Sequence, residues 1–183
     1  MRVLVTYGSK RGGTGGLAEM LGAALTAQGF QVDVRPAAET AGVEGYDAVI
    51  VGGALYMFRW HRDARRFIQR NAEALRSLPV WLFSSGPLDD SAATSELPPI
   101  AQVERLMTRI GARGHRTFGG RLLPEAKGFI ASKMARAHSG DWRDPRLVSA
   151  WAAEIGEVLH AGSVAPWRPS PRVEEQPPEA PIG

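Results

Sequence analysis

A short apolar strand at the start of the chain runs directly into a glycine-rich turn, and a helical pattern follows at once. The strand covers about residues 2–7, and the turn lies within residues 8–14. Backbone N–H groups at the start of a helix are free to bind an anion, and the helix dipole adds partial positive charge there. The turn also carries hydroxyl and basic side chains: Ser9, Lys10, Arg11 and Thr14. This arrangement predicts a phosphate-binding turn in a fold where a strand leads straight into a helix.

Strand and helix patterns alternate along the rest of the chain. We expect strands at about residues 2–7, 31–35, 48–52, 80–83 and 115–118, and helices at about residues 14–28, 62–76, 100–111 and 145–161. Residues 48–52 are almost continuously apolar, as in a buried strand, whereas residues 31–35 alternate as in an edge strand. With right-handed crossovers, this pattern predicts an α/β fold with a doubly wound five-stranded parallel sheet in the order 2-1-3-4-5. Ligands of such sheets bind at the carboxyl ends of strands one and three.

The composition is that of one globular domain followed by a tail. The 183 residues are 44% hydrophobic and 22% charged, and prolines dominate after residue 163. We therefore expect a domain over residues 1–162 and an extended or disordered Pro-rich tail over residues 163–183. The absence of cysteine excludes disulfides and thiolate chemistry, and the net charge of +3 is too small to indicate nucleic-acid binding. The four histidines show no metal-ligand spacing.

Targeting and membrane signals are missing from the sequence. It shows no secretion signal and no stretch of about 18 apolar residues that would span a membrane. We therefore expect a cytoplasmic location, with peripheral contact at the inner face of the cell membrane as an alternative. Such contact would fall on residues 126–137, an expected short helix with apolar and basic side chains. The simpler interpretation, which we favour, is a solvated helix that packs a small apolar face on the sheet edge.

Three phosphate-binding motifs can be compared with the first turn. A P-loop has the spacing Gly-x-x-x-x-Gly-Lys-Ser/Thr, and Thr14 stands where its lysine should be. A dinucleotide fingerprint needs Gly-x-Gly-x-x-Gly and an acidic residue at the end of the second strand, where this chain has Arg35. The flavin mononucleotide (FMN) loop, Thr/Ser-x-Thr-Gly-x-Thr, matches at Ser9, Gly12 and Thr14 and differs at Arg11. The turn is therefore interpreted as the phosphate half of an FMN site.

At these residues the chain resembles the flavodoxin family, and within it the short menaquinone-dependent protoporphyrinogen oxidases of haem synthesis. The closer likeness includes residues 46–55, His61, the basic helix at 67–75, residues 77–79 and the stretch at 127–137. It covers about residues 1–160 and leaves out the tail. The resemblance implies a flavodoxin-like fold with FMN as the cofactor.

The resemblance also implies where FMN is held. Its phosphate would lie on the first turn, on Ser9, Lys10, Arg11, Gly12, Gly13 and Thr14. Two loops would line the flavin ring, one with Ala54, Leu55 and Tyr56 just beyond the third strand and one with Ser84, Ser85, Gly86, Pro87 and Leu88 just beyond the fourth. Arg11 stands where the family usually has a small hydroxyl or acidic residue, so it either pairs with the phosphate or crowds the loop.

The function implied by the resemblance is an FMN-dependent oxidoreductase that oxidises protoporphyrinogen IX and passes electrons to a quinone. The alternatives are an electron-transfer flavodoxin or quinone reductase with a redox partner protein, and a non-catalytic flavodoxin-like binding domain. Residues 56–61 combine aromatic and basic side chains that either bind a flat substrate or pack on the next helix. Within them, His61 is a candidate proton carrier or simply the start of that helix. The arginines of the helix form a solvated face or a docking surface for an acidic partner.

Overall fold

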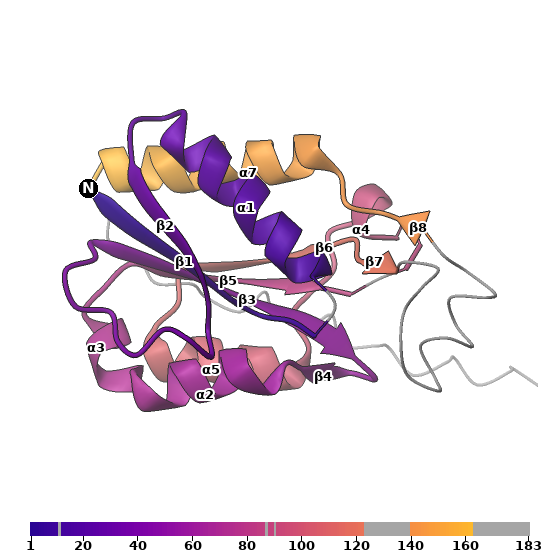
Figure 1. Ribbon diagram of the computed structural model, residues 1–183, viewed down its shortest axis with the longest axis horizontal. Coiled ribbons are helices and arrows are strands. Elements are labelled where there is room, and N and C mark those ends of the chain that lie inside the picture. The colour runs from indigo at the N-terminus through magenta and orange to yellow at the C-terminus, as the bar shows by residue number, and fades with distance from the viewer. Residues whose placement is uncertain (11, 87, 90, 123–139, 163–183) are drawn as a thin grey trace, which may run out of the picture.

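Five parallel strands form the centre of the molecule in a computed structural model that describes all residues except 11, 87, 90, 123–139 and 163–183 (Figure 1). The strands are β1 (Arg2–Gly8), β2 (Gln31–Pro36), β3 (Ala48–Tyr56), β5 (Val80–Ser85) and β6 (Gly114–Phe118). Their order is β2-β1-β3-β5-β6, which confirms the predicted flavodoxin-like order 2-1-3-4-5. The strand of alternating pattern, β2, lies at one edge, as predicted.

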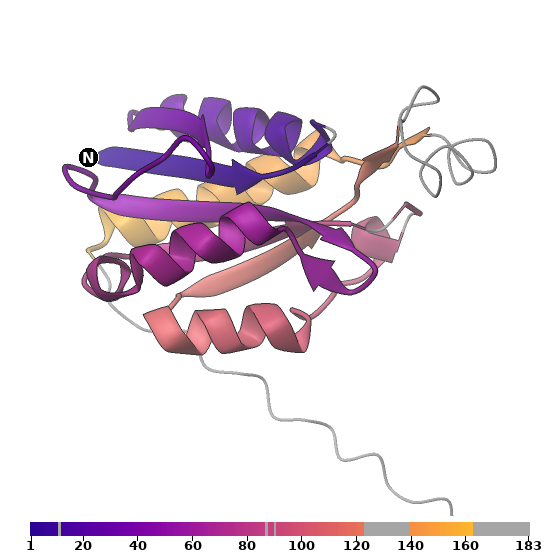
Figure 2. The same ribbon diagram turned by 60° about the horizontal axis from the view of Figure 1, so that its bottom comes forward.

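Helices cover both faces of the sheet (Figures 1 and 2). On one face lie α1 (Gly13–Thr26) and α7 (Pro145–His160), and on the other lie α2 (Arg62–Arg70), α3 (Ala72–Arg76) and α5 (Ala101–Ile110). The central strands are buried on both faces of the sheet, so each face has its own apolar cluster beneath the helices that cover it. The two-sided cover leaves the carboxyl edge of the sheet as the place for a ligand.

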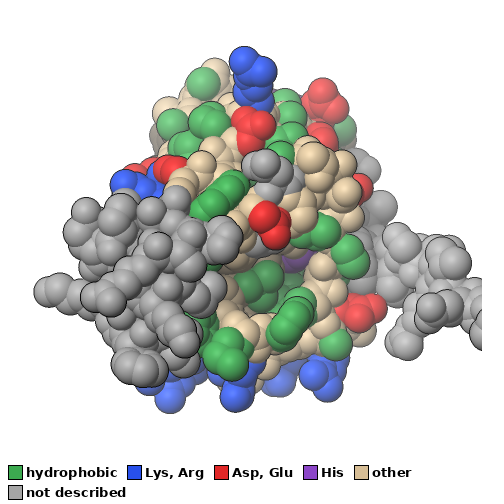
Figure 3. All heavy atoms as spheres, turned by 90° about the vertical axis from the view of Figure 1, so that its right-hand side faces the viewer, with side chains coloured by type: hydrophobic (Ala, Val, Ile, Leu, Met, Phe, Trp, Pro, Cys, Tyr) green, Lys and Arg blue, Asp and Glu red, His purple; other side chains and the backbone are tan. Residues whose placement is uncertain are grey.

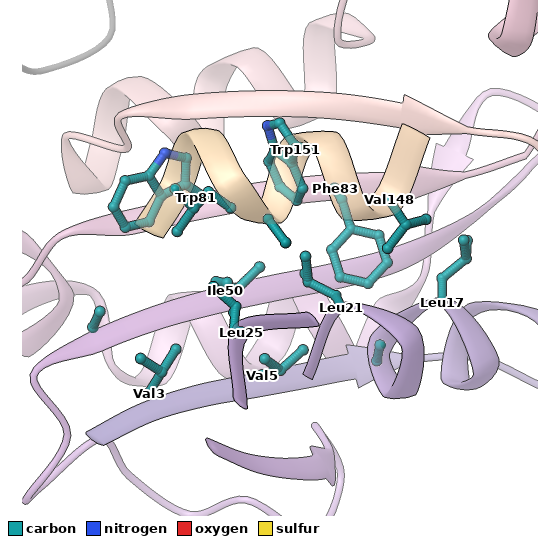
Figure 4. Close-up of a cluster of buried hydrophobic side chains, with 14 of the residues drawn as sticks. Val3, Val5, Leu17, Leu21, Leu25, Ile50, Trp81, Phe83, Val148 and Trp151 are labelled. Atoms are coloured by element: carbon teal, nitrogen blue, oxygen red, sulfur yellow. The ribbon is translucent and has the colours of Figure 1, made fainter. Parts of the chain in front are cut away.

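Large aromatic side chains fill the cluster beneath α1 and α7 (Figure 4). Phe83 of β5 is 1% exposed and meets the ring of Phe118 edge-on at 6.1 Å and that of Trp151 at 6.4 Å. Figure 4 shows Phe83 and Trp151 between α7 and the sheet, with Leu17 and Leu21 of α1 nearby. Edge-to-face aromatic pairs of this kind add to the stabilisation from burial alone. This cluster fixes β5 relative to α1, two elements that carry expected site residues.

Helix two was predicted as one element over residues 62–76 and is divided at Asn71. The side chain of Asn71 donates to the Phe67 carbonyl at 3.0 Å, and its backbone leaves the helical region with φ −108° and ψ 15°. An asparagine side chain that bonds a carbonyl of the preceding turn competes with the helical backbone. The result is two helices, α2 and α3, in place of the single one predicted.

Strands three and four extend further than predicted, which corrects the placement of two expected ring loops. β3 continues to Tyr56 because its end pairs with β4 (Arg59–Trp60) in an antiparallel hairpin, and β5 continues to Ser85. A short helix, α4 (Ser91–Thr94), follows β5 and was not among the expected helices. Two further strands that were not predicted, β7 (Arg121–Leu122) and β8 (Gly140–Asp141), pair with each other.

Two predictions fall outside the described residues. These are the short helix at residues 126–137 and the Pro-rich tail at residues 163–183. Among the residues that the structure describes, no helix has both the length and the apolar character needed to cross a bilayer.

Candidate functional site

A cavity of about 530 Å³ opens at the carboxyl edge of the sheet. Its walls come from the first turn, the end of β3 with β4 and the start of α2, the segment after β5, and the residues after β6. Figure 3 views this edge and shows a hollow with hydrophobic side chains in its floor and at its rim, and Lys and Arg side chains along one side. A cavity of this size is typical of small-molecule and cofactor sites.

Most of the predicted site residues meet at this cavity. It is lined by Ser9, Lys10, Gly13, Thr14, Ala54, Leu55, Tyr56, Ser85, Gly86 and Leu88. Arg11 and Pro87 lie outside the described residues. Gly12 and Ser84 are in the structure but do not line the cavity.

The first turn presents the start of α1 to the cavity. Gly12 precedes the helix with φ 74°, a conformation that glycine adopts without steric cost, and supplies no side-chain cap. The hydroxyl oxygen of Thr14, in the first helical turn, is buried and has no hydrogen-bond partner among the described residues. An uncapped helix start with an unpartnered buried hydroxyl is suited to an anionic group.

Two further lining residues also carry buried donors without a partner in the described part of the chain. The described residues hold unpartnered buried side-chain atoms in Thr14, Trp60, His61, Arg65 and His115. The first three of these residues line the cavity. Because buried polar groups are normally satisfied, their concentration at one cavity indicates that a polar ligand completes it.

The charge of the cavity wall favours an anion. The described lining residues include four cations, Lys10, Arg59, Arg62 and Arg121, and no acidic residue. Cations around a cavity raise the local concentration of negatively charged ligands and pair directly with phosphate oxygens. The wall is therefore positive at the side of the first turn and of α2.

Arg121 and Gly120 are site residues that the sequence did not suggest. They follow β6, and a Cβ atom placed on Gly13 would lie 3.5 Å from Arg121. The Arg121 Nε also lies 3.7 Å from a carboxylate oxygen of Asp141 on β8. The pair Gly119-Gly120 after the fifth strand was a signal for close backbone approach, but nothing in the sequence placed it beside the first turn.

Ser84, a predicted contact of the flavin ring, does not line the cavity and forms a hydrogen bond within the sheet. It is 1% exposed, and its hydroxyl is 2.9 Å from Nε2 of His115 on the neighbouring strand β6. Since β5 continues to Ser85, successive side chains point to opposite faces, and Ser85 lines the cavity while Ser84 does not.

Acid is expected to destabilise the protein through His115. Burial lowers the pKa of His115 to about 4, so between this value and the ordinary pKa of about 6.5 the unfolded chain binds more protons than the folded one. The contribution of neutral His115 to the free energy of unfolding is fully present above pH 6.5. It falls by roughly 3 kcal/mol as the pH drops towards 4. Urea unfolding of the protein and of His115→Asn at several pH values measures this. A wild-type pH slope that the variant retains in full would contradict the assignment, and the exposed His160→Asn serves as the control.

The end of β3 forms a hairpin at the rim of the cavity. Met57 and Phe58 both have positive φ, 47° and 57°, and their side chains are 70% and 89% exposed. A turn with two positive φ values favours Asn-Gly, and other residues adopt this conformation at a steric cost. An apolar pair is therefore held in solvent, in a strained conformation, beside Tyr56, which is 43% exposed.

The fold and the cavity together define a doubly wound α/β protein with a ligand-sized cavity at the carboxyl edge of its sheet. The flavodoxin domain family matches residues 4–138, well over half of the chain. The chain belongs to the flavodoxin domain family, whose members are redox proteins, and FMN is its cofactor.

The curated relatives match a smaller part of the chain. Protoporphyrinogen IX dehydrogenase [quinone] of Escherichia coli K12 is 28% identical over 86 residues, 46% of this chain and 48% of that protein. The protein of the same name from Escherichia coli O157:H7 gives the same values, 28%, 46% and 48%. The chain thus spans about half the length of the curated relatives it matches.

Solved structures support the fold. Flavodoxin 1 from Bacillus cereus has a TM-score of 0.55 at 14% identity, covering 86% of this chain and 98% of that one. Rubredoxin oxygen:oxidoreductase from Desulfovibrio gigas has a TM-score of 0.60 at 14% identity, covering 87% of this chain and 36% of that one. A flavodoxin from the Archaea has a TM-score of 0.52 at 15% identity, covering 85% and 99%.

The cavity residues fit FMN in both its parts. The Thr14 hydroxyl, which has no partner among the described residues, the start of α1 and the nearby cations suit the phosphate. Leu55, Tyr56 and Leu88 offer apolar surface to a flat ring.

Proposed function

We propose that the chain is an FMN-dependent oxidoreductase that takes electrons from protoporphyrinogen IX and passes them to a quinone. The observation that carries this proposal is the exposed apolar hairpin of Tyr56, Met57 and Phe58 at the rim of the FMN cavity. A porphyrinogen and a quinone are both apolar ring compounds, and exposed apolar side chains beside a cofactor site suit such ligands. The partial match to quinone-linked protoporphyrinogen IX dehydrogenase supports the same substrates.

Different residues around the cavity would bind different parts of FMN and of the substrate. When bound, FMN supplies a ring that takes up a hydride from one substrate and gives electrons to another. The first turn would hold the phosphate and so fix the ring against Leu55 and Leu88. Arg59, exposed beside the hairpin tip, would pair with a propionate carboxylate of the porphyrinogen.

The proposal includes peripheral contact with the inner face of the membrane, because menaquinone dissolves in lipid. The contact would bring the open rim of the cavity to the lipid surface, where the exposed pair Met57 and Phe58 and the cation Arg59 lie. The proposal requires no residue to donate or accept a proton at the reacting atoms.

The double substitution Met57→Asn/Phe58→Gly tests the proposal. It replaces two strained residues with the pair that the turn favours, so we expect the free energy of unfolding to rise by about 1 kcal/mol. We expect kcat/KM for protoporphyrinogen with a menaquinone acceptor to fall by about 10-fold, because apolar contact area is lost. Urea unfolding and an anaerobic turnover assay measure the two effects.

The control is Met20→Asn, which alters a partly buried methionine of α1 that does not line this cavity. Unchanged turnover in the hairpin variant would contradict the role of the hairpin. Wild-type protein that contains FMN but does not oxidise protoporphyrinogen with any quinone would overturn the proposed reaction. Reduction of a protein partner by that same FMN-loaded protein would favour an electron-transfer flavodoxin, whose acidic partner would meet the exposed arginines of α2.

A further inference from the structure

His61 joins the start of α2 to the cavity. It is the N-cap residue of α2, its side chain is 11% exposed, and it lines the cavity beside Lys10 and Arg62. A Cβ atom on Gly8, the last residue of β1, would lie 2.7 Å from His61 Nδ1 and 2.9 Å from the Ala64 nitrogen. The imidazole therefore lies against the strand end that leads into the phosphate turn.

The hydrogen bonds of His61 determine which ring nitrogen carries the proton. The backbone N–H of Asp63 donates to Nδ1 at 3.3 Å, as expected of a side-chain helix cap. In a neutral imidazole with an accepting Nδ1, the proton lies on Nε2, which is then a donor. That Nε2 is buried and has no partner among the described residues. A residue that lines the cavity therefore carries a buried donor with no partner in the described part of the chain.

We propose that the Nε2–H group of His61 donates a hydrogen bond to the phosphate of bound FMN. The position of His61 favours the phosphate of FMN, and not its ring, as the acceptor. His61 lies against Gly8, the residue immediately before the turn that is expected to hold the phosphate. The inference rests on FMN as the cofactor and not on the identity of the substrate.

The charges around His61 agree with a neutral donor in the free protein. Burial is the largest cause that lowers the pKa of His61, and Lys10, Arg62 and Arg65 lower it further. The carboxylate of Asp63 raises it, with an oxygen 3.7 Å from Nδ1. A phosphate dianion beside Nε2 would favour the imidazolium, so binding of FMN is expected to raise the pKa of His61.

Comparison of FMN with riboflavin, which lacks the phosphate, isolates the contact. Asparagine is a preferred N-cap residue, so His61→Asn keeps the cap of α2 while it shortens the side chain and removes the Nε2 donor. We expect this variant to bind FMN about 10- to 100-fold more weakly than wild type, which is the range for a lost hydrogen bond to a charged group. The affinity for riboflavin is expected to stay within about 2-fold, because the ring contacts are intact.

Flavin fluorescence quenching of the flavin-free protein measures both affinities. The thermal midpoint of the flavin-free variant verifies that α2 is intact, and His160→Asn, at the far end of α7, is the matched control. Nitrogen NMR of the flavin-free protein is expected to show the proton of His61 on Nε2, with a pKa that rises when FMN, but not riboflavin, is added.

An equal loss of FMN and riboflavin affinity in His61→Asn would overturn the inference, as would a pKa of His61 that FMN leaves unchanged. In either case the wild-type protein still binds FMN, so the cofactor assignment stands. Wild-type protein that binds neither flavin would contradict the cofactor assignment itself.

Discussion

Replacing Ser9 and Thr14 together with alanine is expected to weaken FMN binding by roughly 10²- to 10⁴-fold, since each hydroxyl would lose a bond to a charged phosphate worth about 1.5–3 kcal/mol. The fold is expected to remain. The Thr14 hydroxyl has no partner among the described residues, so its removal breaks no hydrogen bond with them, and alanine is a better helix former than threonine.

Fluorescence titration of the flavin-free double variant with FMN measures this loss, and circular dichroism verifies the fold. Thr26→Ala is the matched control, because Thr26 lies at the opposite end of α1 and its hydroxyl donates to the Gly22 carbonyl at 2.8 Å. If the double variant held FMN as tightly as the control, the first turn would not be the phosphate site.

Replacing Phe83 with alanine is expected to lower the free energy of unfolding by roughly 3–5 kcal/mol, the range for removal of a large buried aromatic side chain. Phe83 is 1% exposed and contacts Phe118 and Trp151 edge-on, so the substitution leaves a cavity and removes two aromatic pairs. Urea unfolding of the flavin-free protein measures the effect without the contribution of bound FMN.

Phe58→Ala is the control for this substitution, since it makes the same chemical change at a side chain that is 89% exposed. We expect its free energy of unfolding to stay within about 0.5 kcal/mol of wild type. A similar loss in both variants would contradict the packing described beneath α1 and α7.

The order of the sheet and the position of the first turn could be predicted because they depend on local patterns. Residues 48–52 are almost continuously apolar, which indicates a strand buried on both faces, and the alternation in residues 31–35 indicates an edge strand. The turn at Ser9–Thr14 follows the first strand directly, and the carboxyl ends of the two inner strands meet at the same edge. The phosphate half of the site therefore follows from residues close together in the chain.

The rest of the site depends on contacts that are distant in the sequence. The pairing of Leu55 with Trp60 and of Tyr56 with Arg59 extends β3 beyond the predicted end, and it makes a hairpin from residues with no glycine in the turn. Arg121 reaches Gly13 only because β6 and β7 turn back towards the first turn. Neither feature has a local pattern that would have predicted it.

The environment of the two ring nitrogens of His61 could not be predicted from the sequence either. The sequence placed His61 at the start of a helix, and the structure confirms that position. The role proposed for it depends on two further facts, the hydrogen bond from the Asp63 N–H to Nδ1 and the burial of Nε2, which only the folded structure provides.

The absorption spectrum of the purified protein, together with the flavin released on heating, shows most directly whether this cavity holds FMN. We expect a yellow protein with the visible bands of oxidised flavin, which releases equimolar FMN and no other flavin. A colourless protein that does not regain these bands when FMN is added would contradict this expectation.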